Sequence, residues 1–361
     1  MTRTLYLLFV FALSCGTILG KDFHVYSPSP KEKTLWIVKV IPIKDESLKL
    51  EVAEKVKFGF SGRVITAHPT KPILYVISSG GEPGKVPGAV VFLNQGGSYQ
   101  KHQNINFNHG ASYLSLDKKN QHLLGVSYGG QLNVYPLNEE GIPGKAITTI
   151  DEGRLRAHCV LFPPDGKNIY IPYVKQNLAL LQYAYDGETG KVTPLEPQDA
   201  KPPIGSGPRH MAYHPSLPMV YFSNEQGLGI SSYRREPDGQ LKVEQDISIL
   251  PPGMSKIGLT ASDIVITPDG KFLFAGLRGG GQGFDRISRY RVLEDGKAEF
   301  LGLTEADQVP NGLALSPNGK FLFVSATTGA SLTAYRISKN GDLKQVAVLG
   351  WDEGMSDLVT R

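Results

Sequence analysis

The chain has 361 residues, 40% of them hydrophobic, which is enough to bury a large core. Its net charge of +4 is spread without a dense basic cluster, which argues against nucleic-acid binding. Glycine (41 residues) and proline (25 residues) are frequent, and no stretch shows sustained helical periodicity. We therefore expect an all-β protein.

The first 20 residues have the pattern of an export signal. Arg3 supplies a positive start, residues 5–13 form a short apolar core, and small residues suited to cleavage follow. The apolar run is too short for a stable membrane span, although a retained anchor or a lipid attached at Cys15 are alternatives. We expect a signal peptide at 1–20, one mature domain at 21–361, and a periplasmic or extracellular location. Cleavage would leave Cys159 as the one certain cysteine, so no intrachain disulfide is expected.

A turn followed by a β-rich run recurs along the whole chain, at intervals of roughly 45–55 residues that are typical of propeller blades. The clearest turns read Pro-Asp-Gly-Lys or Pro-Asn-Gly-Lys, and they lie at residues 164–167, 268–271 and 317–320, with degenerate copies at 68–71, 117–120 and 214–217. Proline presets such a turn and glycine supplies the positive φ, so the pattern predicts hairpins.

A second series of seven turns alternates with these six, and the mismatch predicts a closed ring. The last blade would take outer strands from residues 23–26 and 34–41 and its innermost strand from residues 355–360. Pairing the two termini in this way protects the sheet edges. We predict a seven-bladed β-propeller of four-stranded antiparallel blades. A pair of β-sandwiches would leave the regular spacing unexplained.

One blade carries a charged pair at a predicted sheet edge. Residues 205–215 read Gly-Ser-Gly-Pro-Arg-His-Met-Ala-Tyr-His-Pro and begin a strand, and Glu225 ends the next strand, sixteen residues after Arg209. A hairpin makes the start of its first strand a neighbour of the end of its second. The same offset links Ser262 to Arg278 in the next blade and His158 to Val174, beside Lys175, in the previous one. Such a convergent polar set is a candidate site.

These segments, at 158–176, 205–225 and 261–278 together with Ser127-Tyr128-Gly129, resemble the seven-bladed β-propeller lactonases. That family includes bacterial 6-phosphogluconolactonase of the propeller type and fungal carboxy-cis,cis-muconate cyclase. The resemblance covers about residues 22–361. It implies a catalytic site made of a histidine, two arginines and a glutamate, which fall on His158, Arg209, Arg278 and Glu225.

The chain departs from the family pattern at two positions. Tyr113 stands where phosphogluconolactonases of this type usually have histidine, and Asn311 follows Pro310 where an arginine is usual. The missing arginine and the export signal both argue against a phosphorylated substrate.

Lactone opening needs an activated water, a stabilised oxyanion and an acid for the leaving alkoxide. Glu225 is a candidate general base, but two arginines would make it a weaker one, and His158 is the alternative. Arg209 and Arg278 would hold a substrate carboxylate or stabilise the oxyanion. The structural alternatives are a cross-strand ion pair for Arg209 with Glu225, and a hydrogen bond to a backbone carbonyl for His158.

Six further residues are predicted to bind substrate, and they are Tyr113, Tyr128, Lys175, His210, Asp263 and Asn311. Because neighbours on a strand diverge, His210 is expected on the face opposite Arg209, where packing is its alternative role. Asp263 is expected either to orient Arg278 or to cap a turn. No cluster has metal-ligand spacing, so we expect no metal or other cofactor.

Three functional hypotheses follow from these residues. The first is an exported, monomeric lactonase that hydrolyses a sugar lactone or related cyclic ester at the channel mouth, with a lactone or carboxylated sugar-type ligand as its partner. The second is a non-catalytic ligand-binding or protein-binding propeller. The third is a carboxymuconate-type cycloisomerase, which would use the same residues.

Overall fold

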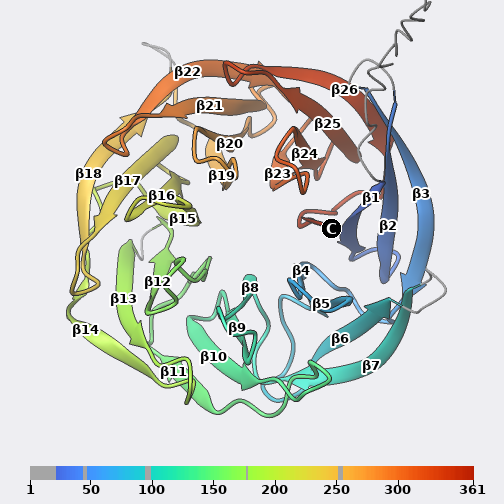
Figure 1. Cartoon of the computed structure of the whole chain (residues 1–361), viewed down its shortest axis with the longest axis vertical. Coiled ribbons are helices and arrows are strands. Elements are labelled where there is room, and N and C mark those ends of the chain that lie inside the picture. The colour runs from blue at the N-terminus through green and yellow to red at the C-terminus, as the bar shows by residue number, and fades with distance from the viewer. Residues whose placement is uncertain (1–21, 44–46, 94–98, 176–177, 251–254) are drawn as a thin grey trace, which may run out of the picture.

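The computed structural model describes residues 22–43, 47–93, 99–175, 178–250 and 255–361. They form a ring of seven β-sheets around a common axis (Figure 1), so the predicted seven-bladed propeller is confirmed. Arg3, Cys15 and the rest of the predicted signal peptide lie outside the described residues. Within the described ranges, no helix is long and apolar enough to cross a membrane.

The strands of each blade lie side by side in its sheet, in order from the innermost strand at the centre of the ring to the outermost. Blade 1 contains β4 (Val64–Ala67), β5 (Ile73–Ile77), β6 (Val86–Leu93) and β7 (Tyr99–Phe107); blade 2 contains β8 (Tyr113–Leu116), β9 (His122–Val126), β10 (Gln131–Pro136) and β11 (Thr148–Asp151). Blade 3 contains β12 (Asn168–Tyr173), β13 (Ala179–Tyr185) and β14 (Val192–Asp199); blade 4 contains β15 (Pro208–Tyr213), β16 (Met219–Asn224), β17 (Gly229–Arg235) and β18 (Leu241–Ser248). Blade 5 contains β19 (Thr260–Ile266), β20 (Phe272–Arg278), β21 (Arg286–Val292) and β22 (Ala298–Glu305); blade 6 contains β23 (Pro310–Leu315), β24 (Phe321–Ala326), β25 (Ser331–Ile337) and β26 (Leu343–Gly350). Blade 7 contains β27 (Val359–Thr360), β1 (Phe23–Ser29), β2 (Thr34–Pro42) and β3 (Leu48–Lys57).

Blade 3 differs from the other blades at its innermost position. The segment that precedes β12 lies beside it in the place of a fourth strand. It pairs with β12 by one isolated bridge, between Ala157 and Tyr173, and by a hydrogen bond from His158 N to Pro172 O at 3.0 Å. His158 therefore lies on an irregular inner segment, where the backbone is less constrained than in a regular ladder.

The two ends of the chain close the ring in blade 7, as predicted. Val25 pairs with Thr360 and Tyr26 with Val359, while His24 and Arg361 exchange two backbone hydrogen bonds of 2.8 and 2.9 Å. Figure 1 shows the C-terminal strand on the inner side of the N-terminal strands. Without this pairing β1 would present an open sheet edge to the centre of the ring.

The core consists of apolar clusters that lie between neighbouring blades. Each cluster joins residues of two adjacent blades, and together they run around the whole ring, including the interfaces of blade 7 with blades 6 and 1. Each sheet is therefore covered on both faces, which explains why its central strands are almost continuously apolar.

A buried tyrosine adds a polar link at three of these interfaces. Its hydroxyl donates at 2.8 Å to a glycine carbonyl in an outer turn of the next blade, in the pairs Tyr75–Gly141, Tyr170–Gly239 and Tyr221–Gly296. The bond satisfies a hydroxyl that burial would otherwise leave unpaired. Because the same link recurs at equivalent positions, it sets how one blade is placed against the next.

Candidate active site

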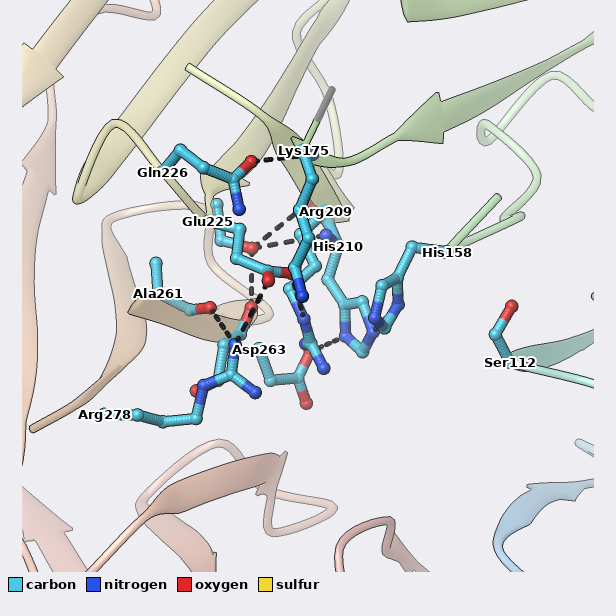
Figure 2. Close-up of polar contacts among 12 residues, drawn as sticks. Ser112, His158, Lys175, Arg209, His210, Glu225, Gln226, Ala261, Asp263 and Arg278 are labelled. Atoms are coloured by element: carbon cyan, nitrogen blue, oxygen red, sulfur yellow. Dashed lines mark hydrogen bonds and ion pairs between the residues drawn. The ribbon is translucent and has the colours of Figure 1, made fainter. Parts of the chain in front are cut away.

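Charged side chains from blades 4 and 5 form an ion-paired group at the ends of their inner strands. Arg209 lies on β15, Glu225 follows β16 directly, and Arg278 ends β20. Arg209 Nε lies 3.3 Å from Glu225 Oε2, and Arg278 Nη2 lies 3.8 Å from Glu225 Oε1 (Figure 2). The hairpin argument correctly placed Arg209 beside Glu225, and the ring brings the second guanidinium to the same carboxylate.

Hydrogen bonds hold the backbone of Glu225 on both sides. Glu225 N donates to Gly207 O at 2.7 Å within blade 4, and Ala261 N donates to Glu225 O at 3.1 Å from blade 5. Gly207 has φ +62°, and a Cβ there would overlap Gln226 Oε1. A glycine is therefore needed where the chain enters β15, and this explains part of the Gly-Ser-Gly-Pro connection.

A β-bulge brings Arg209 and His210 into the same polar group. The pairing of β15 with β16 shifts register around these two residues, so strict alternation of the side chains is lost. The expectation that His210 lies on the opposite face was wrong for this reason. Innermost strands β19 and β23 are bulged at the equivalent positions, beside Asp263 and Asn311. The bulges thus direct side chains of three blades toward the site.

Two histidines and an aspartate form a hydrogen-bonded chain across blades 3, 4 and 5. His158 Nδ1 lies 3.2 Å from His210 Nε2, and His210 Nδ1 lies 2.7 Å from Asp263 Oδ1. Asp263 Oδ2 also accepts a hydrogen bond of 2.8 Å from Leu313 N in blade 6. We expected Asp263 to orient Arg278 or cap a turn, but its side chain binds His210 and the neighbouring blade.

Arg278 is held by blade 6 and by its own blade. Its Nη2 donates to Ala261 O at 2.9 Å, and its Nη1 donates to Asn311 Oδ1 at 3.3 Å. Asn311, predicted to bind substrate, therefore contacts a predicted catalytic arginine directly. This pair of bonds limits the rotation of the guanidinium.

The ion-paired group is largely buried, and Arg278 is its most exposed member. The side chains of Arg209 and Glu225 are 7% and 6% exposed, whereas that of Arg278 is 20% exposed. Arg209 Nη1 and Arg278 Nε are buried, and neither has a hydrogen-bond partner among the described residues. Unpaired guanidinium donors at such depth are costly, and an incoming anionic oxygen would offset that cost.

Burial dominates the electrostatics of the group. It lowers the pKa of Arg278 to about 10, helped by repulsion from Arg209, and it also lowers the pKa of Arg209 against the attraction of Glu225. Burial and the charge of Arg209 hold the pKa of His158 well below its usual value of 6.5. The same two causes lower the pKa of His210, although Asp263 opposes them. Both imidazoles are therefore neutral at pH 7.

Two of the other predicted substrate-binding residues, Tyr113 and Tyr128, pack against the histidines. Tyr113 and His210 form a T-shaped pair with centroids 5.2 Å apart, and Tyr128 and His158 form one at 5.7 Å. Tyr128 is 41% exposed, so this side of His158 is the open one. Lys175 has an exposed side chain, and its backbone N donates to Gln226 Oε1 at 2.9 Å.

Two residues that hold the backbone of the site were not predicted from the sequence. Ser112 Oγ donates to Ala157 O at 2.7 Å, next to His158, and Gln226 binds the backbone of Lys175. A signal for Ser112 was present, because a serine precedes a polar residue at the start of the innermost strand here and again at Ser262. Gln226 had no such pattern.

The residues that the structure describes contain no group of three or more His, Cys, Asp or Glu side chains arranged to hold a metal ion. Two hollows of about 400 and 390 Å³ lie near the inner turns, lined by residues such as Asp117, Asp165 and Pro164. Neither is lined by a predicted site residue. The candidate site is therefore identified by the chemistry of its side chains and not by a hollow.

An all-β propeller with charged groups gathered from several blades is a fold that hosts enzymes and binding proteins alike. Residues 25–349 match the family described as "Lactonase, 7-bladed beta-propeller". The chain belongs to this family and is itself a lactonase.

Named relatives and a solved structure agree with this assignment. The 6-phosphogluconolactonase of Pectobacterium carotovorum is 30% identical over 65% of this chain and 70% of its own length. That of Sodalis glossinidius is 27% identical over 90% of this chain and 94% of its own. The periplasmic gluconolactonase of Pseudomonas aeruginosa shares the fold with a TM-score of 0.81 and 19% identity, over 94% of this chain and 99% of that one.

Glu225→Gln tests whether one carboxylate balances both arginines. The substitution keeps the side-chain shape but leaves two buried guanidinium groups without their counter-charge, so urea unfolding should show a loss of about 3–5 kcal/mol. Glu299→Gln is the matched control, because Glu299 pairs with Arg291 at an exposed position, and this variant should unfold almost like the wild type. Equal midpoints for the two variants would contradict the shared ion pair.

Proposed function

We propose that the chain is an exported enzyme that hydrolyses a sugar lactone, or a related cyclic ester, at the mouth of the propeller channel. The observation that carries the proposal is a neutral, half-buried histidine, His158, near enough to Arg209 and to the partly open guanidinium of Arg278 for both charges to act on it. A base and an anion-stabilising cation are the two elements that ester hydrolysis needs. The names of the relatives support the substrate class.

His158 suits the role of general base better than Glu225. Both carboxylate oxygens of Glu225 face a guanidinium group, at 3.3 and 3.8 Å, and its side chain is 6% exposed. A carboxylate whose two oxygens are both held by ion pairs is poorly placed to reach a water molecule. His158 is neutral and lies beside the exposed Tyr128. We assign Glu225 the task of holding the two arginines.

The reaction then balances without a further reactant. His158 takes a proton from a water molecule as the water oxygen bonds to the lactone carbonyl carbon. The resulting oxyanion is stabilised by Arg278, with the buried charge of Arg209 behind it. When the intermediate collapses, the bond between the carbonyl carbon and the ring oxygen breaks, and the ring oxygen takes the proton back from His158. The product is one open-chain hydroxy acid.

The proposed substrate carries no phosphate group. Asn311 occupies the position where the resemblance led us to expect another arginine, and its side chain is already bonded to Arg278. Tyr113 packs against His210 and adds no cationic group. A phosphate would therefore meet one arginine fewer here than in the pattern that the resemblance implies.

Export is supported by the signal-like residues 1–20, and the solved relative from Pseudomonas aeruginosa is itself described as periplasmic. We expect the mature protein to be recovered outside the cytoplasm with a new N-terminus near residue 21. N-terminal sequencing of the exported fraction checks this, and an intact Met1 would count against it.

A panel of lactones, plain and phosphorylated, tests the proposed reaction in a proton-release assay. Wild-type protein should hydrolyse a plain sugar lactone faster than its 6-phosphate, and His158→Gln should lower kcat by about 10²–10⁴ because the base is lost. His24→Gln would not serve as a control, since His24 lies where the termini close the ring, so the matched control is Glu299→Gln. Wild-type protein that binds lactones without opening any of them would favour the binding propeller.

The pH profile tests which group is the base. Because the pKa of His158 lies well below 6.5, the imidazole takes up a proton only at acidic pH. Values of kcat/KM should therefore stay level from about pH 7.5 to 6.5 and fall at lower pH, as the protonated form loses its lone pair. An acid limb with its midpoint above pH 6.5 would exclude His158 in this role.

A further inference from the structure

Hydrogen bonds join Asp263, His210 and His158 in a row. Because the carboxylate of Asp263 can only accept, it decides which atom donates in each of these bonds. Figure 2 shows the three side chains in line, each from a different blade. Asp263 Oδ1 accepts from Ile264 N at 2.8 Å as well as facing His210, and Oδ2 accepts from Leu313 N at 2.8 Å. A carboxylate oxygen has only lone pairs to offer, so the groups that face it must donate to it.

The proton positions follow step by step. His210 Nδ1 faces this carboxylate at 2.7 Å, so Nδ1 carries the hydrogen. His210 is neutral, so its Nε2 is a bare acceptor. His158 Nδ1 lies 3.2 Å from that Nε2 and must therefore be the donor. His158 is neutral too, and its Nε2 is left with a free lone pair.

We propose that Asp263, acting through His210, fixes His158 in the tautomer protonated at Nδ1 and so leaves Nε2 to accept a proton. Asp263 and His210 are then positioning residues rather than the substrate-binding residues that the sequence suggested. That Nε2 serves as a base rests on the proposed function, whereas the tautomer itself does not.

Aromatic packing supports the alignment of the two rings. Tyr113 packs against His210 in a T-shaped pair with an interplanar angle of 85°, and Tyr128 packs against His158 at 86°. His210 and His158 are themselves 5.0 Å apart between centroids, at 63°. These contacts hinder the ring rotation that would exchange Nδ1 and Nε2.

The hydrogen bonds through His210 to Asp263 also stabilise the proton after His158 has accepted it. A protonated His158 would keep its Nδ1–H bond to His210, whose other nitrogen is bonded to the negative charge of Asp263. Arg209 and Arg278 oppose protonation of His158, and the carboxylate offsets part of that repulsion. The imidazolium would thus be a short-lived intermediate that readily returns its proton to the leaving oxygen.

The competing explanation is that Asp263 only links blades. Asp357 provides the comparison, because its Oδ2 accepts from Ile65 N of blade 1 at 2.8 Å and its Oδ1 accepts from Leu358 N at 3.0 Å. Asp263 makes the same two kinds of backbone bond and adds the bond to His210. Asp357→Asn is therefore a matched control that disturbs a blade link without touching the histidines.

The test uses long-range ¹H–¹⁵N NMR of the ring nitrogens in histidine-labelled protein, with His158→Gln and His210→Gln to assign the signals. In the wild type both histidines should show a protonated Nδ1 and a bare Nε2. In Asp263→Asn the single amide oxygen cannot replace all the carboxylate bonds, so His158 should lose its single tautomer, and kcat should fall by about 10²–10⁴ with little change in KM. Asp357→Asn should keep the wild-type tautomer.

A wild-type His158 protonated at Nε2 would overturn the proposal, and so would an unchanged His158 spectrum in a folded Asp263→Asn. If that variant fails to fold, His210→Phe serves in its place, since it breaks the chain at the middle and should release the tautomer of His158. The predicted tautomer in a protein that opens no lactone would refute the proposed function and leave the positioning chain intact.

Discussion

The structure depends on the burial of each blade between two others. No sheet in the ring covers its own apolar faces, so the clusters between blades stabilise the fold only when the ring is complete. The pairing of β27 with β1 completes it and leaves a strand of two residues at the inner edge of blade 7. The same constraint positions the site, because closure brings the inner strands of blades 3, 4 and 5 together around one axis.

Buried charge is the second constraint, and it explains why the site is rigid. Glu225 offsets two guanidinium groups that would otherwise be strongly destabilising where they lie, and backbone bonds from blades 4 and 5 hold it in place. Arg278 is tied to Asn311, and His158 is tied through His210 to Asp263. Preorganised donors cost no rearrangement when negative charge develops on a substrate, so such an arrangement favours hydrolysis of an ester.

The local pattern of turn and strand residues predicted the strands correctly, and it predicted the pair of charged residues that a single hairpin joins. The turn signals predicted the blade order, and sixteen residues of separation predicted the contact of Arg209 with Glu225. It failed for His210 because a bulge changes the direction of a side chain without leaving a mark in the residue pattern. It also failed for Asp263, since its partners lie on blades 4 and 6.

The sequence by itself determined the repeat, the number of blades, the closure by both termini and the residue types of the site, since all of these follow from turn chemistry, strand periodicity and family resemblance. Only the tertiary structure decided which groups face one another and in which protonation state. The physical reason is that bulges redirect side chains and burial shifts pKa values, and both depend on residues far apart in the chain. His158 illustrates this, because its neutral imidazole is set by Arg209, His210 and the depth of the site.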